Sequence, residues 1–74
     1  MACRVGITQD PEKRKRYWST QHPSLRNWQL LYKYVSKSAA QSAEEREAQK
    51  YGCIAHPGGT GPEYSVWYVY YFEY

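Results

Sequence analysis

The chain has 74 residues, which suffices for one domain (residues 1–74) near the lower size limit for a self-sufficient core. Nine Tyr and three Trp stand against one Phe, and such side chains combine a large apolar surface with a polar tip. The sequence has no apolar run of about 18 residues and no signal-peptide pattern, so we expect a soluble, cytoplasmic protein with no membrane partner.

The net charge of +3 is divided unevenly along the chain. Residues 1–37 carry eight Lys and Arg against two acidic residues, whereas residues 38–74 carry two against five. A basic half of this kind attracts phosphates or an acidic partner, although a solvated helix face has the same composition.

The first predicted elements are a strand at about 3–8 and a basic helix at about 11–20. Asp10 is a good N-cap, and Pro11 is already fixed at a helical φ in the first helical position. The pair His22-Pro23 is expected to end this helix, because proline pushes the preceding residue out of helical geometry.

The middle of the chain predicts a strand at about 28–36 and a helix at about 38–51. Strict alternation places four apolar side chains on one face of that strand, namely Trp28, Leu30, Tyr32 and Tyr34. Ser38 and Gln41 fit a capping box at the helix start, and Gly52 is the residue expected just after the helix end.

Residues 52–63 form a glycine-rich loop that is either a connector or a phosphate cradle, and a strand at about 65–73 follows. Alternation in residues 66–74 predicts one face with Val66, Tyr68, Tyr70, Phe72 and Tyr74, and another with Trp67, Val69, Tyr71 and Glu73. The order of elements predicts a small α+β domain of the β-α-β-α-β type. Its sheet is expected to have three strands, mainly antiparallel, packed with two helices.

The sequence leaves open whether Cys3 and Cys53 form a disulfide. They could pair, or they could join His22 and His56 as candidate zinc ligands, but no C-x2-C element is present. Two small buried thiols are the favoured interpretation.

The order of motifs from Arg4 to Tyr51 resembles the core of the GIY-YIG nucleases. Arg4-Val5-Gly6 stands where that family has its YIG strand, and Arg14 falls at the position of the family's catalytic arginine. Residues 40–44, Ala-Gln-Ser-Ala-Glu, resemble the helix that carries the family's metal-binding glutamate, which indicates Glu44. The resemblance implies phosphate contact by Arg14 and binding of Mg²⁺ or Mn²⁺ by Glu44.

The chain departs from the family at both of its tyrosines. Arg4 replaces the tyrosine of YIG, and no GIY strand comes before it. If strand 66–74 pairs beside Val5, Tyr68 or Tyr70 could take the place of a missing tyrosine. Without them, Arg14 and Glu44 preserve phosphate contact better than metal-assisted hydrolysis, so we expect a protein that is not an enzyme and needs no cofactor.

The leading functional prediction is therefore a non-catalytic module that binds nucleic acid or nucleotide phosphate on a degenerate GIY-YIG-like core. The predicted phosphate-binding residues are Arg4, Lys13, Arg14, Lys15, Arg16 and Arg26. The predicted stacking or interface residues are Tyr17, Trp18, Trp67 and Tyr71.

Two alternatives remain open. One is a small phage or mobile-element protein that binds a host protein, or a second copy of itself, through an exposed edge of strand 66–74. The other is an active nuclease that depends on a divalent metal, with Arg14 and Glu44 in the site.

Overall fold

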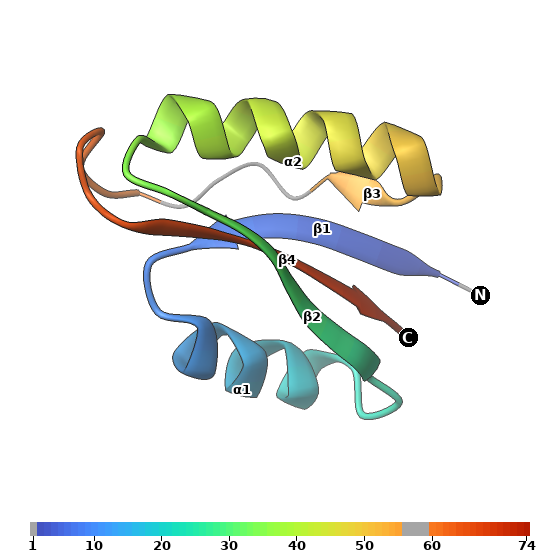
Figure 1. The fold of residues 1–74 in the computed structure, drawn as a ribbon. Helices are drawn as coiled ribbons and strands as arrows, with labels where there is room; N and C mark the ends of the chain where they lie inside the picture. The colour runs from blue at the N-terminus through green and yellow to red at the C-terminus, as the bar shows by residue number, and fades with distance from the viewer. Residues whose placement is uncertain (1, 56–59) are drawn as a thin grey trace.

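The computed structural model describes residues 2–55 and 60–74, which form a small α+β domain. Its elements are β1 (Cys3–Thr8), α1 (Pro11–Gln21), β2 (Arg26–Tyr34), α2 (Lys37–Tyr51), β3 (Ile54–Ala55) and β4 (Trp67–Glu73). Figure 1 shows the sheet as a middle layer, with α2 on one side and α1 on the other. No helix of the described residues is long and apolar enough to cross a membrane.

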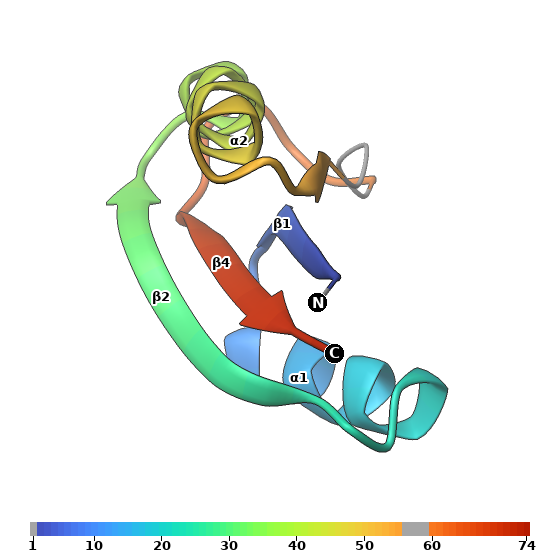
Figure 2. The same cartoon turned by 90° about the vertical axis from the view of Figure 1, so that its right-hand side faces the viewer.

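The sheet has four strands in the order β2-β4-β1-β3, so the prediction of three strands is wrong. The extra strand, β3, is only two residues long and pairs in parallel with β1. β4 runs antiparallel to both β1 and β2 and lies between them (Figure 2). β1, β2 and β3 therefore all point the same way.

This topology explains why the two helices lie on opposite faces. The connection through α1 leads from β1 across β4 to β2, and the connection through α2 leads back across the sheet to β3. Two crossovers of the same hand that move in opposite directions must use opposite faces. The carboxyl ends of β1, β2 and β3 meet at one end of the sheet, where β4 begins.

The core has one half on each face of the sheet. Beneath α2, Val5, Ile7, Trp67 and Val69 pack against small residues of the helix. Beneath α1, the core is mainly aromatic: Trp18, Tyr70 and Phe72 are buried, and the half-buried Leu25, Trp28 and Tyr74 pack against them. The predicted division of β4 between two faces is confirmed by these contacts.

The ends of the helices follow the sequence signals in three of four cases. Asp10 caps α1 by accepting a hydrogen bond from the amide of Lys13, and Pro11 stands in the first turn. α2 ends at Gly52, whose φ of 68° lies in the left-handed region. α2 begins at Lys37, one residue from the predicted start, but the predicted capping box at Ser38 is wrong. The N-cap is Ser36, whose hydroxyl accepts from the amide of Ala39.

The alternation predicted for β2 is also wrong. Its pairing with β4 shifts register twice, between Arg26 and Gln29 and again between Leu30 and Tyr32. Trp28 packs in the core on the α1 side, whereas Tyr34, predicted on the same face, packs together with Leu31 on the α2 side. Leu30 is 48 % exposed. A bulge adds a residue to one strand, and every later side chain then changes face.

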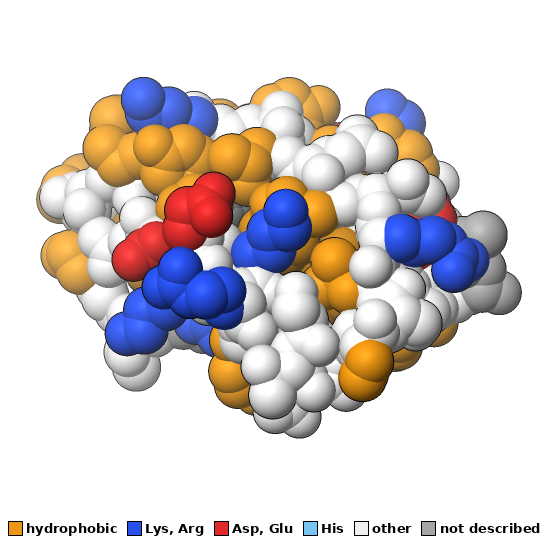
Figure 3. Space-filling model, turned by 90° about the horizontal axis from the view of Figure 1, so that it is seen from below, with side chains coloured by type: hydrophobic (Ala, Val, Ile, Leu, Met, Phe, Trp, Pro, Cys, Tyr) orange, Lys and Arg blue, Asp and Glu red, His pale blue; other side chains and the backbone are white. Residues whose placement is uncertain are grey.

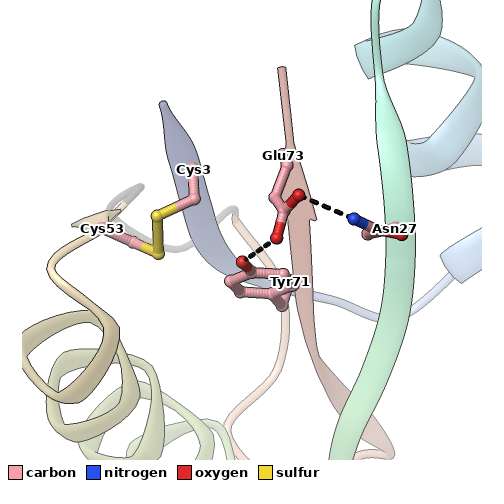
Figure 4. Close-up of a disulfide and its surroundings, with 5 residues drawn as sticks. All are labelled: Cys3, Asn27, Cys53, Tyr71 and Glu73. Atoms are coloured by element: carbon pink, nitrogen blue, oxygen red, sulfur yellow. Dashed lines mark hydrogen bonds between the residues drawn. A yellow bond between two sulfur atoms is a disulfide. The ribbon is translucent and has the colours of Figure 1, made fainter. Parts of the chain in front are cut away.

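Cys3 and Cys53 form a disulfide, so the interpretation of two reduced thiols is wrong. Figure 4 shows the bond between β1 and the segment that follows α2, with Tyr71 and Glu73 on the neighbouring strand β4 and Asn27 beyond them on β2. Disulfides persist mainly in oxidising compartments, and the expected cytoplasmic location stays a prediction.

Candidate functional site

A cavity of about 360 Å³ lies at the carboxyl end of β1, where the chain turns into α1. Its lining comes from this turn, the first two turns of α1 and the region before β4: Ile7, Thr8, Gln9, Asp10, Lys13, Arg14, Tyr17, Thr60 and Trp67. In open sheets with parallel strands, ligands bind outside the carboxyl ends of the strands. The position of the cavity therefore makes it the candidate functional site.

Two cations and one carboxylate line this cavity. Lys13 and Arg14 are adjacent on α1, with Lys13 exposed and Arg14 half-buried. Asp10 is already engaged, because its carboxylate accepts the hydrogen bond from the Lys13 amide. The two cations leave a positive balance, which favours an anion.

Tyr17 supplies an aromatic wall to the same cavity and is 48 % exposed. The guanidinium carbon of Arg14 lies 5.5 Å from the centre of the Tyr17 ring, a cation–π contact that holds the arginine over the helix. Trp18 meets the Tyr17 ring edge-on at 5.0 Å. These contacts position Arg14 and Tyr17 together, one turn apart on the same helix.

Close packing around Gly61 holds the far wall in place. The Gln9 side chain donates a hydrogen bond of 2.7 Å to the Ser65 hydroxyl, and the Trp67 indole donates one of 2.9 Å to the Pro62 carbonyl. A Cβ on Gly61 would lie 2.7 Å from Gln9 Oε1 and 2.9 Å from the Trp67 ring. Glycine is therefore required for this close approach.

The other predicted cations lie outside the cavity. Lys15 and Arg16 are exposed on α1, and Arg26 lies 3.6 Å from a carboxylate oxygen of Glu73. The Arg4 guanidinium lies over the Trp18 ring at 5.0 Å and the Tyr74 ring at 5.8 Å. Figure 3 views the face covered by α1 and shows Lys and Arg in separate groups, with acidic side chains beside one of them. The cavity thus contains two of the six predicted phosphate ligands.

Of the four predicted stacking residues, Tyr17 is exposed and the other three are held by the fold. Trp18 is 5 % exposed and Trp67 2 % exposed, so a nucleobase has little access to either ring. Tyr71 is half-buried, and its hydroxyl donates to Glu73 at 2.5 Å. This bond to the carboxylate raises the pKa of Tyr71 to about 12.

The two β4 tyrosines that were candidates for the site, Tyr68 and Tyr70, pack within the fold and do not line the cavity. β4 pairs beside Val5, which was the condition for a tyrosine to replace a missing one, and Gly6 stands opposite Tyr70. The Tyr70 side chain is fully buried, and its hydroxyl accepts a 2.9 Å hydrogen bond from the Trp18 indole. Burial raises its pKa. Tyr68 is half-buried, with the Lys33 ammonium 5.9 Å from its ring centre.

Glu44 does not share a cleft with Arg14. It is 3 % exposed on α2, on the opposite face of the sheet from α1, and it does not line the cavity. Its Oε2 atom has no hydrogen-bond partner among the described residues, so Arg14 does not bond to that atom. Burial, with a smaller repulsion from Glu45, raises the pKa of Glu44 to about 7. Within residues 2–55 and 60–74, no group of three or more Cys, His, Asp or Glu could hold a metal ion.

Sequence reasoning missed the rest of the cavity lining. Thr8 and Gln9 follow directly from β1, and the rule that ligands bind at carboxyl ends of parallel strands could have indicated them. Thr60 comes from a distant loop, and only the path of the chain brings it to this place. Within the candidate phosphate cradle at 52–63, residues 56–59 lie outside the described residues, and the candidate zinc ligand His56 is one of them.

Comparisons with models of known families, with curated proteins and with solved structures find no match for this chain. The structure itself defines a small α+β domain with a mixed four-stranded sheet and a basic cavity at the end of β1.

Proposed function

We propose that this protein binds the phosphates of nucleic acid or nucleotides through the cavity at the end of β1, without catalysing their hydrolysis. The observation that carries the proposal is the presence of Lys13, Arg14 and the exposed ring of Tyr17 in one cavity. Cations that contact phosphate together with an aromatic ring that can stack on a base are the usual elements of single-strand recognition.

The position of Glu44 supports binding without hydrolysis. Metal-assisted cleavage needs the metal ligand and the phosphate ligand at the same phosphate. Here the carboxylate lies beneath α2 and the guanidinium lies on α1. The degenerate GIY-YIG-like origin that the motifs imply is part of this proposal.

The test is fluorescence anisotropy with a labelled single-stranded oligonucleotide over a range of salt concentrations. We expect affinity to fall steeply with salt, and Lys13→Glu and Arg14→Glu to weaken it and make the salt slope shallower by about one unit each. Lys50→Glu is the matched control. Lys50 is exposed in the last turn of α2, on the opposite side of the sheet from α1, and it does not line the cavity. Equal loss in all three variants, or affinity insensitive to salt, would refute the proposed site.

A second candidate function is protein binding through β2. The proposed partner edge in residues 66–74 is not available, because β4 is hydrogen-bonded on both sides. The side of β2 away from β4 pairs with no strand among the described residues. The side chains of Leu30 and Tyr32 on this strand are 48 % and 40 % exposed. An open edge of this kind is suited to pairing with a strand of a host protein or of a second copy.

Light scattering during gel filtration tests the self-pairing form of this candidate. Pairing of two β2 strands predicts a dimer that Leu30→Pro weakens, since proline cannot donate to a ladder. Leu30→Ala is the control that keeps the backbone donor. A monomer at all concentrations would leave only a foreign partner for this edge.

A further inference from the structure

We infer that the cavity selects a terminal phosphomonoester, such as the 5′-phosphate of a single strand or a free nucleotide, over the internal phosphates of a polynucleotide. The inference rests on the proposed function and specifies the ligand of the same site.

The first argument is charge. An internal phosphodiester carries one negative charge, whereas a phosphomonoester carries about two near neutral pH because its second pKa is about 6. Lys13 and Arg14 place two cations in one cavity, and neither forms a salt bridge among the described residues. With the Asp10 carboxylate counted, the lining carries two positive charges and one negative. This positive balance attracts a dianion more strongly than a monoanion.

The second argument is shape. A volume of about 360 Å³ is near the lower limit for a small-molecule site and suits a single nucleotide. An internal phosphate carries a sugar on each side, so it can enter a concave site only if the strand bends sharply. A terminal phosphate has one such substituent and can enter end-on.

The third argument is the path that the rest of the ligand takes out of the cavity while its phosphate stays bound. Tyr17 lines the cavity and is also 48 % exposed, so its ring reaches from the lining to the surface. A base attached to the bound phosphate can stack on that ring, and stacking is tolerant of sequence. The ring would favour a single strand, because the bases of a duplex are already paired.

The experiment compares one fluorescent oligonucleotide sequence with a 5′-phosphate and with a 5′-hydroxyl, each as a single strand and as a blunt duplex. We expect the phosphorylated single strand to bind at least about tenfold more tightly than its hydroxyl counterpart. Competition with a nucleoside 5′-monophosphate separates the two sources of the group. Displacement at similar concentrations indicates free nucleotides as the ligand, and much weaker displacement indicates strand ends.

Two variants assign the effect to the cavity. Arg14→Glu is expected to abolish the preference for the 5′-phosphate. Lys15→Glu, an exposed position on the same helix outside the cavity, is expected to weaken both oligonucleotides equally and leave the preference intact. Equal affinity for the phosphate and hydroxyl forms would overturn the inference while leaving phosphate binding standing. Failure to bind any of the oligonucleotides would overturn both.

Discussion

Gly6 shows how one residue permits the close packing of the aromatic core beneath α1. A Cβ at this position would lie 2.5 Å from Tyr70 Cζ, which is shorter than the contact distances of real Cβ atoms. Tyr70 cannot move away easily, because it is fully buried, bonds to the Trp18 indole and stacks on Trp28 at 4.9 Å. The glycine of the YIG-like motif is therefore explained by packing in this chain.

Gly6→Ala is expected to lower the free energy of unfolding by about 1–3 kcal/mol, the usual cost of overpacking a core. Urea denaturation followed by tyrosine and tryptophan fluorescence measures the loss. Ala2→Gly, at an exposed position before β1, is a control that is expected to change the midpoint little. Unchanged stability in Gly6→Ala would show that Tyr70 has room to move.

Glu44 is a second residue whose surroundings predict a measurable effect. Burial raises the pKa of this carboxyl from 4.5 to about 7 in the folded chain. The folded protein therefore holds a proton that the unfolded chain has lost, so stability is highest below pH 4.5 and falls as the pH rises to about 7. Above pH 7 this contribution does not change further.

Glu44→Gln keeps the shape of the side chain and removes the charge. At pH 8 the variant is expected to exceed the wild type by on the order of 2–3 kcal/mol, and at pH 5 the difference should be much smaller. Urea denaturation at both pH values gives the comparison. Glu47→Gln is the control, because Glu47 is equally buried but bonds to Arg46 at 3.4 Å and is expected to gain nothing. A stabilisation of Glu44→Gln that is the same at both pH values would contradict the assignment.

At the scale of elements, local sequence signals predict an element well where neighbouring contacts agree with them. Residues 66–74 alternate regularly, and both faces of β4 are predicted correctly for this reason. β2 fails because its register shifts and the positive φ of Asn27, 56°, depend on the pairing with β4. The two-residue β3 lies at the start of a turn-rich run, and only β1 beside it makes it a strand.

The start of α2 depends on a residue 27 positions away. Glu63 Oε2 accepts hydrogen bonds from the Ser36 hydroxyl at 2.7 Å and from the Ser38 amide at 2.9 Å, and the Glu63 carbonyl accepts from the Lys37 amide. This contact joins the loop before β4 to the first turn of α2. A capping box read from local sequence could not include it.

Glu63→Gln is expected to loosen the first turn of α2 while the rest of the helix stays folded. The hydrogen bonds to Ser38, and then Ser36, lower the pKa of Glu63, so its contribution is present above pH 4.5 and is lost as the pH falls through the lowered value. Amide hydrogen exchange at pH 7 measures the effect as faster exchange at Ser38. Exchange at the Ala48 amide, far along the helix, is the internal control and should not change.

At the scale of the whole molecule, the disulfide reinforces the shortest strand pairing of the sheet, that of β1 with β3. Cys3 opens β1 and Cys53 precedes β3, and these two strands share only the pairs Arg4–Ile54 and Val5–Ala55. The two cysteines lie 50 positions apart, and no local pattern relates them. Their pairing follows from the parallel alignment of β1 and β3, which the sequence does not reveal.

A cross-link over about 50 residues removes much of the entropy of the unfolded chain, and the chain-entropy relation assigns it about 4 kcal/mol. A small domain has a total stability of about 5–15 kcal/mol, so the bond is expected to supply a large share here. Urea denaturation of the oxidised protein, of the protein in a phosphine reductant and of Cys3→Ala/Cys53→Ala gives three midpoints. We expect the last two to agree with each other and to lie well below the first. An oxidised and a reduced protein with the same midpoint would show that the pairing of β1 with β3 needs no covalent support.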